Sequence, residues 1–494
     1  MKKTSINLIP NIKNPTPDYY CTWQTQLYAT NDGKPQGQRA LIGEKALFCK
    51  EKPYGWAYFY EQVRDNLFLV MDDSWDVPVN NDLSYLGSLI LDKEKFASFV
   101  GDSSNNVNAL KKLSDKIKAL GWKGLGGWVC AQESSQYIGE LSWEEYWTKR
   151  LTEANEAGIS YWKVDWGKWC RNLERRQKLT QLGRKYAPNL VIEHSMILDA
   201  IPFSDTFRTY DVPAIMSIPM TMEKIANLSS AENCRNGNMC LINCEDEVYI
   251  SAACGFAMGI MRHPFSGAFV NGNADMSFPL CHRNLKTKIY EVIRAVNFHK
   301  IAPAFAFSGK DLYISENILY DNWKFEKIEE EIESWWFEQA SVADYVSDNI
   351  LTKNGPAIIS RNTNLPVVTP NVNGLVPFVI ASKNPNGAYA VATLGRTSQR
   401  DYHIPKCNVK INAENSKTIG VFGEYENLII NTNIDTVNRI LIQDLADQNA
   451  YDITHDVTFK KGSIIISGKL IKDVCMLIQP EDDTSEPGVV IQII

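Results

Sequence analysis

The sequence lacks the features that bring a protein to nucleic acid or to a membrane. Its 494 residues carry 51 basic and 58 acidic side chains, so the formal net charge of −7 offers no basic field to phosphate backbones or anionic lipids. No apolar run approaches the roughly 18 residues that a membrane-spanning helix needs. We therefore expect neither nucleic acid nor a membrane among the partners.

The first twenty residues, MKKTSINLIPNIKNPTPDYY, also lack the pattern of a secretory signal. Asn7, Pro10 and Asn11 interrupt the apolar stretch, and no small-residue cleavage site follows it. The eleven cysteines are an odd count in a long chain, which is typical of free thiols in a reducing compartment. We expect a cytoplasmic location, or a periplasmic or secreted one if the native leader is absent from this sequence.

Motifs for a metal ion or an organic cofactor are missing as well. Cys234, Cys240 and Cys244 match neither CxxC nor CxxH spacing, and no histidine lies near them. No GxGxxG follows the first predicted strand, as a dinucleotide-binding fold would require. We predict no metal and no cofactor. His194 and His263 fall at the ends of predicted strands, where we expect hydrogen-bonded structural residues.

Over residues 15–310, short apolar segments alternate with longer helical patterns such as 108–120, 143–157 and 174–186. The first of these helical patterns ends at Gly121, a favourable C-cap. Alternating strands and helices predict an α/β fold with a parallel sheet, and eight such units favour a closed (β/α)8 TIM barrel over an open doubly wound sheet. The predicted strands are residues 20–24, 67–71, 124–130, 161–165, 190–194, 206–210, 240–244 and 259–263.

The pattern changes after about residue 350. Proline and asparagine punctuate the stretch RNTNLPVVTPNVNG, and short alternating segments such as PFVIAS, AYAVATL and NVKINA follow it. Turn signals separate these segments, which predicts an antiparallel β-sandwich. We therefore divide the chain into a catalytic barrel with an N-terminal extension, residues 1–350, and a C-terminal β-sandwich domain, residues 351–494.

The segment YWKVDWG, residues 161–167, places a cation and a carboxylate on a buried strand. Side chains at i and i+2 of a strand point the same way, so Lys163 and Asp165 share one face among aromatic residues. Burying two ionisable groups destabilises a protein unless they pair or take part in chemistry. The spacing makes this strand a candidate for the functional site.

Catalytic groups of a barrel lie at the carboxyl ends of its strands, and four other predicted strands also carry polar or aromatic residues there. Five neighbouring strand ends with carboxylates, cations and tryptophans predict a single site. Ten of the thirteen tryptophans lie at or before Trp169, and indole faces suit the apolar faces of sugar rings. The residues at these four strand ends are Asp72 and Asp73 (in DDSW), Trp128, Glu193, and Arg208 and Asp211 (both in FRTYDV).

Two carboxylates in different environments suit glycoside hydrolysis, in which one is ionised and the other holds a proton. Lys163 beside Asp165 would lower the pKa of that carboxylate. Asp211 lies in a more apolar run, which would raise its pKa, whereas Arg208 would oppose this if it paired with Asp211. The residues therefore predict Asp165 as the anionic partner and Asp211 as the acid.

Three motifs resemble those of the α-galactosidase-type retaining glycosidases, glycoside hydrolase families 27 and 36 of clan D. DDSW resembles the DD-x-W of these families, WKVDWG their Y-x-K-x-D, and FRTYDV their WR-x-x-x-D-[IV]. The resemblance covers about residues 18–310 and implies a (β/α)8 barrel followed by a β-sandwich. It also implies that Asp165 is the nucleophile and Asp211 the general acid/base. The implied substrate-binding residues are Trp23, Asp72, Asp73, Trp128, Lys163, Glu193 and Arg208.

Some alternatives stay open at this point. The spacing from the arginine to the aspartate is three here, whereas these families usually have four, so Asp205 is kept as an alternative acid. The expected activity is retaining cleavage of a terminal α-linked sugar, such as an α-galactoside, from an oligosaccharide or glycoside. A non-catalytic carbohydrate-binding barrel and an aldolase that forms a Schiff base on Lys163 are the competing functions. The sugar, the linkage, transfer instead of hydrolysis, and the oligomeric state are left open.

Overall fold

The computed structural model describes residues 1–494 except 31–34, 52–53, 102–104, 210–215, 230–239, 246, 262–287, 325–345, 348–349, 400, 435 and 461. None of the helices in these described ranges has the length and apolar character needed to cross a membrane.

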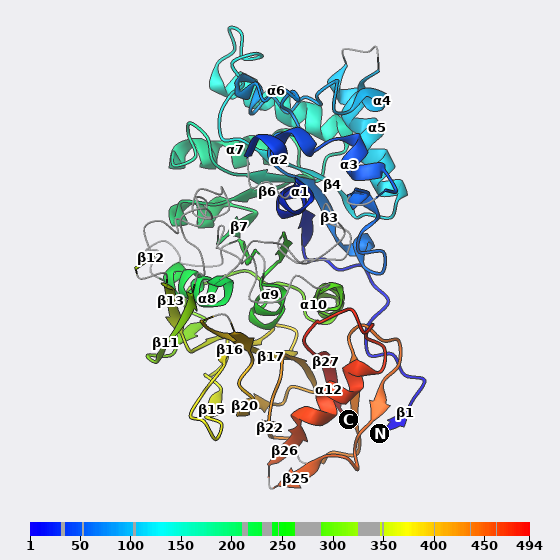
Figure 1. The fold of residues 1–494 in the computed structure, drawn as a ribbon, viewed down its shortest axis with the longest axis vertical. Helices are drawn as coiled ribbons and strands as arrows, with labels where there is room; N and C mark the ends of the chain where they lie inside the picture. The colour runs from blue at the N-terminus through cyan, green and yellow to red at the C-terminus, as the bar shows by residue number, and fades with distance from the viewer. Residues whose placement is uncertain are drawn as a thin grey trace.

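The N-terminal part is a barrel of parallel strands (Figure 1). Eight strands pair in the order β8-β7-β6-β5-β4-β3-β2-β9, and a parallel bridge between Asn243 and Ala257 closes the ring. This closure confirms the predicted (β/α)8 fold and rules out an open sheet. The strands are β2 (Tyr19–Cys21), β3 (Phe68–Met71), β4 (Gly124–Val129), β5 (Tyr161–Val164), β6 (Val191–His194), β7 (Thr206–Arg208), β8 (Leu241–Asn243) and β9 (Gly259–Ile260).

Helices connect the strands and cover the outside of the barrel. The helix α6 begins with a capping box formed by Ser142 and Glu145 and ends at Gly158, whose φ of 70° is the left-handed conformation that favours glycine. Gly121, predicted to end a helix, has a φ of 99° just after α5. The helices are α1 (Trp23–Thr30), α2 (Pro35–Leu41), α3 (Glu44–Phe48), α4 (Ala97–Val100), α5 (Asn106–Ala119), α6 (Trp143–Ala157), α7 (Leu173–Tyr186), α8 (Ser217–Leu228), α9 (Val248–Cys254) and α10 (Ile289–Ile301).

The glycines of β4 leave room for large rings around the site. A Cβ atom on Gly126 would lie 2.7 Å from the Cβ of Tyr161, and one on Gly127 would lie 3.1 Å from the ring of Trp75. Trp75 Nε1 donates a hydrogen bond of 2.9 Å to the carbonyl of Trp128. The sequence GLGGW therefore lets Tyr161 and Trp75 pack directly against the strand that carries Trp128.

Two sheets form the C-terminal β-sandwich. The first has the order β1-β24-β23-β27-β21-β17-β16-β14-β10 and the second the order β15-β20-β22-β26-β25. Their strands are β1 (Lys2–Lys3), β10 (Leu312–Ile314), β14 (Ile358–Arg361), β15 (Val367–Thr369), β16 (Phe378–Lys383), β17 (Tyr389–Leu394), β20 (Asn408–Glu414), β21 (Thr418–Phe422), β22 (Asn427–Thr432), β23 (Ile440–Asp444), β24 (Tyr451–Asp452), β25 (Thr458–Lys460), β26 (Ser463–Ser467) and β27 (Gly488–Ile493), and the helix α12 (Gly468–Met476) packs on them.

This sandwich differs from the prediction in two ways. Three strand pairs, β14 with β16, β17 with β21 and β20 with β22, are parallel, so the sheets are mixed and not purely antiparallel. The larger sheet also takes up β1 and β10, both of which precede residue 350. The expected boundary at residues 350–351 falls inside β13 (Ile350–Pro356), which pairs with β11 (Ile318–Lys324) and β12 (Val346–Ser347).

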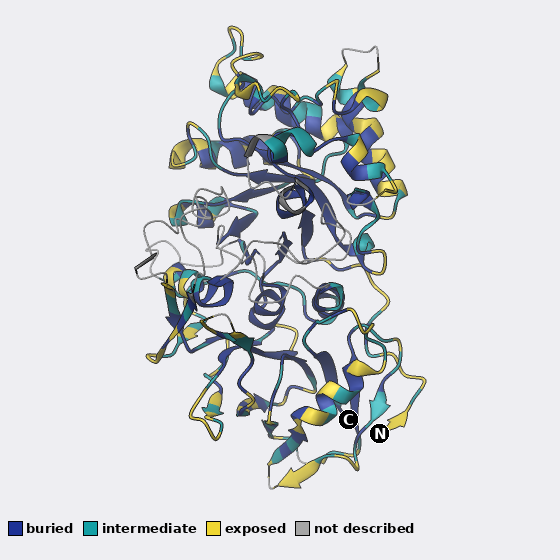
Figure 2. Ribbon diagram, viewed as in Figure 1, coloured by how far each residue is buried: buried dark blue, intermediate teal, exposed yellow. Residues whose placement is uncertain are grey.

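The central strands of the nine-stranded sheet, such as β16, β17 and β23, are buried (Figure 2). Val379 and Ala381 face the sandwich core, whereas Phe378 and Ile380 belong to the core that includes the barrel helices. The helices α8, α9 and α10 form a layer between the barrel strands and this sheet (Figure 1). The alternation of side chains along β16 thus joins the two halves of the protein.

Arg294 on α10 fastens this layer to the sheet. Its guanidinium, 0% exposed, donates two hydrogen bonds of 2.8 Å to the two carboxylate oxygens of Asp444 on β23. Its remaining nitrogen bonds to Gln479 and to the Glu486 carbonyl. The pair joins the barrel layer to the sandwich through a planar, two-point contact.

Replacing Arg294 by Met is expected to lower the free energy of unfolding by about 3–5 kcal/mol, because Asp444 is left buried without its cation. Equilibrium urea unfolding measures the loss. The matched control is Arg439→Met, since Arg439 pairs with Asp452 but is 38% exposed, and exposed pairs contribute about 0–1 kcal/mol. Equal losses in the two variants would contradict the role assigned to Arg294.

Candidate active site

The pairing of the barrel strands brings the predicted polar residues into one row. Lys163 on β5 lies beside Trp128 on β4 and Glu193 on β6, and Arg208 ends β7 beside Asn243 on β8. In a parallel barrel all these positions lie toward the carboxyl ends of the strands. The row is buried: Lys163 is 2%, Trp128 1%, and Glu193 and Arg208 0% exposed.

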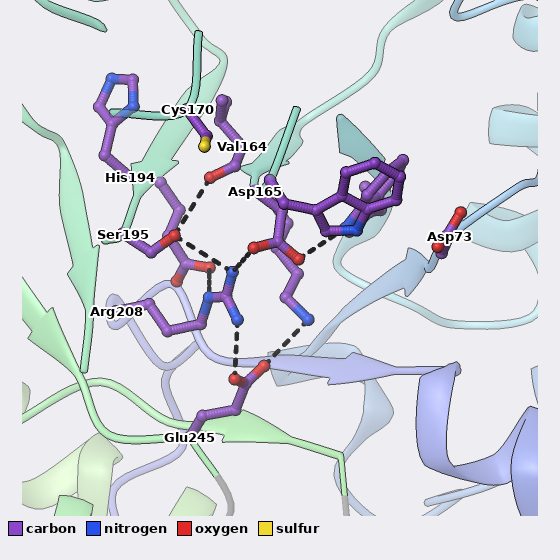
Figure 3. A network of polar contacts seen from close by, with 12 residues as sticks. Asp73, Val164, Asp165, Cys170, His194, Ser195, Arg208 and Glu245 are labelled. Carbon is purple, nitrogen blue, oxygen red and sulfur yellow. Dashed lines mark hydrogen bonds and ion pairs between the residues drawn. The ribbon is translucent and has the colours of Figure 1, made fainter. Parts of the chain in front are cut away.

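Arg208 is the central cation of the cluster (Figure 3). One of its nitrogens lies 3.0 Å from Asp165 Oδ1, another 3.0 Å from Glu245 Oε2, and its Nε 3.3 Å from Glu193 Oε1. The same nitrogen that faces Asp165 donates to the hydroxyl of Ser195 at 3.4 Å. One buried guanidinium thus organises three carboxylates from three different strand ends.

Asp165 is held by two donors. Trp128 Nε1 donates a hydrogen bond of 2.8 Å to Asp165 Oδ2, while Arg208 approaches Oδ1. The backbone is fixed as well, because Asp165 N donates to the Val129 carbonyl at 2.9 Å and Arg176 donates to the Asp165 carbonyl at 3.0 Å. The carboxylate is therefore preorganised, with only 6% of the residue exposed.

Lys163 pairs with other carboxylates. Its ammonium lies 3.0 Å from Asp72 Oδ2 and 3.0 Å from Glu245 Oε1, and it also contacts the sulfurs of Cys21 and Met261 at 3.5 and 3.7 Å. Burial alone would lower the pKa of Lys163, but Asp72 and the other anionic neighbours raise it well above its usual value. The cation in contact with Asp165 is Arg208, and not Lys163 as the strand spacing indicated.

Glu193 lies inside the barrel. Its carboxylate accepts hydrogen bonds from Tyr161 at 2.8 Å, Asn243 at 2.6 Å and Tyr19 at 3.2 Å. Burial raises the pKa of Glu193 to about 6, against the opposing influence of Arg208. Among the described residues of the site, Glu193 is therefore a carboxyl group that can hold a proton near neutral pH.

His194 is structural, as expected. Its Nδ1 lies 3.0 Å from an Arg176 nitrogen and its Nε2 2.8 Å from the Thr180 hydroxyl. Burial and the neighbouring guanidinium lower the pKa of His194 well below its usual value, so the ring is neutral. His194 thereby supports Arg176, which in turn fixes the carbonyl of Asp165.

Asp73 has a different partner from Asp72. Arg39 on α2 donates two hydrogen bonds, of 3.1 and 3.2 Å, to Asp73 Oδ2, and its guanidinium lies 5.8 Å from the centre of the Trp166 ring. In Figure 3, Asp73 lies apart from the Arg208 network. Lys95 links the backbone of α2 to the segment that follows β3, because its ammonium donates hydrogen bonds to the carbonyls of Arg39 and Ser74.

Two residues beside the site have unusual backbone conformations. Ser74, the third residue of DDSW, and Met196, two residues after β6, both have a φ of 72°. A non-glycine residue in this left-handed region costs free energy and is often found at functional sites. The strained positions follow the strand ends that carry Asp73 and Glu193.

Not every predicted residue can be placed. Asp211, Cys234 and His263 lie outside the described residues. Trp23 opens α1 in the same buried apolar cluster as Cys21 and Met261. Trp23 therefore shares an apolar cluster with two residues that contact Lys163.

Asp205, the alternative acid, precedes β7. Its carboxylate accepts a hydrogen bond of 2.9 Å from Ile192 N and lies 3.6 Å from Arg184. This position is at the amino end of the strand, whereas Asp165 follows the carboxyl end of β5. Asp205 therefore does not suit the acid role.

Glu245 is the main residue that the sequence prediction missed. It bridges the two buried cations, Lys163 and Arg208, and is 2% exposed. The available signal was its position directly after the predicted strand 240–244. Among the described residues, no group of His, Cys, Asp and Glu side chains is arranged to hold a metal ion.

The fold and this cluster define a (β/α)8 barrel protein with a polar site at the carboxyl ends of its strands. No family model matches the sequence, and no curated protein matches it. Solved structures with some similarity include a proposed α-galactosidase from Bacteroides fragilis (11% identity, TM-score 0.41, 97% of this chain and 79% of that chain), a family 27 β-L-arabinopyranosidase from Geobacillus stearothermophilus (9%, 0.39, 97% and 96%) and an α-galactosidase from Saccharomyces cerevisiae with raffinose (9%, 0.36, 97% and 98%).

These proteins are of the type that the three sequence motifs resemble. The fold itself rests on the strand pairing described above.

Proposed function

We propose that the protein is a retaining glycoside hydrolase that removes a terminal α-linked sugar, such as an α-galactoside or a related α-glycoside. The observation that carries the proposal is the Asp165 carboxylate, which Trp128 and Arg208 hold in a fixed orientation at the end of a barrel strand. A nucleophile that must attack one carbon atom benefits from such prior orientation. The resemblance of the motifs to α-galactosidase-type enzymes supports the same function.

In the first step, Asp165 attacks the anomeric carbon and forms a glycosyl ester while the bond to the leaving oxygen breaks. Asp211 gives its proton to that oxygen. In the second step, Asp211 takes a proton from water, the water oxygen attacks the anomeric carbon, and Asp165 is released. The products are the sugar with retained configuration and the free alcohol. This route needs the two carboxyl groups about 5–5.5 Å apart.

The other described residues of the site have roles in binding. Asp72 and Asp73 offer carboxylate oxygens to sugar hydroxyls, and Trp128 and Trp23 offer apolar surface. Lys163 and Arg208 pair with the carboxylates around them and hold these in place. The Schiff-base alternative finds no support, since an aldolase lysine needs a lowered pKa, whereas the pKa of Lys163 is raised.

A panel of nitrophenyl α- and β-glycosides tests the proposal. It should include galactose, N-acetylgalactosamine, glucose and L-arabinose, with the anomer of the first product followed by proton NMR. We expect hydrolysis of at least one α-glycoside, and the α-anomer as the first product. A first product of inverted configuration would contradict the double-displacement route. Failure to cleave any member would contradict hydrolysis of small terminal glycosides.

Arg39 provides a prediction about substrate binding. In Arg39→Met, Asp73 loses two hydrogen bonds and the charge that opposes the effect of burial, so the pKa of Asp73, already raised by burial, rises further. If the ionised form of Asp73 binds a sugar hydroxyl, KM should rise about tenfold. The acidic limb of kcat/KM should also move to higher pH. The exposed Arg175→Met serves as control, and an unchanged pH profile in Arg39→Met would contradict this role.

A further inference from the structure

A cavity outside the barrel cluster is lined by a different set of residues. It has a volume of about 960 Å³ and is walled by β11 on one side and by the hairpin of β18 (Arg396–Ser398) and β19 (Asp401–His403) on the other. Its polar and aromatic lining includes Tyr320, Asn322, Ser398, Gln399, Asp401 and His403. None of these residues belongs to the proposed active site.

Tyr320 offers an open aromatic face in this cavity. At 62% exposure it is the most exposed aromatic side chain among the described residues. Its orientation follows from strand alternation, because Asp321 and Trp323 of β11 are buried at 1% and 4% while Tyr320 and Asn322 line the cavity. An aromatic ring held outward on a paired strand is available to stack on a ligand.

The walls of the cavity are fixed before any ligand arrives. Asp321 accepts hydrogen bonds from Arg396 Nε at 2.6 Å and from Thr397 N at 2.8 Å, which ties the hairpin to β11. Gln399 N donates to Asn322 Oδ1 at 2.8 Å, and Arg396 donates to the Tyr320 carbonyl at 2.9 Å. A site with preformed walls loses little conformational entropy on binding.

The lining also indicates which ligands fit. Arg396 is the one Lys or Arg among the described lining residues, and its charge is already paired with Asp321. An anionic ligand would therefore gain little. Tyr320, Leu375 and Pro405 supply apolar lining, which suits the apolar face of a sugar ring. Amide, hydroxyl, carboxylate and imidazole groups around one aromatic face suit the hydroxyls and the apolar face of a sugar ring.

We propose that this cavity is a second carbohydrate site, which binds a neutral oligosaccharide with one ring stacked on Tyr320. Asn322 contacts its hydroxyls from the wall formed by β11, and Gln399, Asp401 and His403 from the wall formed by the hairpin. Binding here does not depend on hydrolysis in the barrel. It would keep an oligosaccharide or a polymer close to the protein by a contact independent of the reacting sugar.

The test uses the full chain and four neutral trisaccharides, namely raffinose, maltotriose, cellotriose and xylotriose. Titration calorimetry measures affinity, and saturation-transfer NMR reports which sugar protons contact the protein. We expect at least one trisaccharide to bind, Tyr320→Ala to weaken this binding at least tenfold, and Tyr320→Trp to preserve it. Asp401→Ala, which changes an 83% exposed side chain on the opposite wall, should weaken binding as well.

The matched control is Tyr313→Ala. Tyr313 on β10 is a 49% exposed tyrosine of the same part of the chain, outside the cavity lining. Its removal should leave trisaccharide binding intact, and Tyr320→Ala should leave the hydrolysis of small nitrophenyl glycosides unchanged. The proposal is overturned if wild type binds none of the four sugars, if Tyr320→Ala binds as wild type does, or if Tyr313→Ala weakens binding equally. The barrel site would also accept the terminal α-linked sugar of raffinose or maltotriose, so the comparison of Tyr320→Ala with Tyr313→Ala, and not binding by wild type alone, tests this cavity. Hydrolysis of nitrophenyl glycosides tests Asp165 separately.

Discussion

Asp165→Asn is expected to lower kcat by at least about 10⁴-fold on any glycoside that the wild-type protein cleaves. An amide cannot form the glycosyl ester, and no other described carboxylate is held at this strand end by both an indole and a guanidinium. Steady-state kinetics on the best nitrophenyl glycoside measures the loss. Substrate binding, followed by calorimetry, should persist, because Asp72, Asp73 and the tryptophans are unchanged.

The variant has a predictable effect on stability. Trp128 Nε1 and Arg208 each approach a different oxygen of Asp165. In Asp165→Asn one of these donors faces the new amide NH2 group and loses its acceptor, which costs about 1–3 kcal/mol. A loss of activity in a variant that stays folded at the assay temperature therefore reports on chemistry and not on unfolding.

Asp205→Asn is the matched control, since it makes the same chemical change at the amino end of the next-but-one strand. Its carboxylate contacts Ile192 N and Arg184, away from the cluster. We expect nearly wild-type kcat in this variant. Asp211→Asn should lose activity most on substrates with poor leaving groups, because these depend most on protonation. Full activity in Asp165→Asn, or a comparable loss in Asp205→Asn, would reject the assignment.

The sequence allowed the barrel to be predicted because each of its strands has a local signal. Short apolar runs between helical patterns mark all eight strands, and β4 and β5 begin at the predicted residues 124 and 161. Residues at the carboxyl ends of the predicted strands are then expected to lie close together, since these ends meet at one end of a parallel barrel. For this reason Asp72, Trp128, Lys163, Asp165, Glu193 and Arg208 could be named from their positions alone.

The partners of these residues could not be predicted in the same way. Whether Lys163 turns toward Asp165 or toward Asp72 depends on side-chain packing across the barrel, and not on the spacing within β5. Glu245 forms ion pairs with both Lys163 and Arg208. The sequence around it, however, shows only a predicted strand followed by an acidic stretch. The parallel pairs of the sandwich were missed because alternation predicts strands but not the direction of their partners.

Arg208→Met is expected to destabilise the protein by about 3–5 kcal/mol at pH 7, because three carboxylates then lose their shared buried cation. Urea unfolding of the purified variant measures the loss. Arg184→Met is the matched control: Arg184 is 62% exposed and lies 3.6 Å from Asp205, so its removal should cost no more than about 1 kcal/mol.

The loss of folding stability in Arg208→Met should depend on pH. The pKa of Glu193 determines whether this loss is larger at high or at low pH. Its folded-state pKa of about 6 exceeds the ordinary value of about 4.3, so the stabilising contribution of its protonated form is complete below about pH 4 and is lost as the pH rises through about 6. Arg208 lowers the pKa of Glu193, so the folded-state pKa of Glu193 rises further in Arg208→Met. The destabilisation caused by ionising Glu193 then continues to a higher pH and becomes larger. The difference in stability between wild type and Arg208→Met should therefore be larger at about pH 8 than at about pH 5. A difference that is equal at both values, or larger at the lower one, would show that Arg208 does not neutralise this carboxylate.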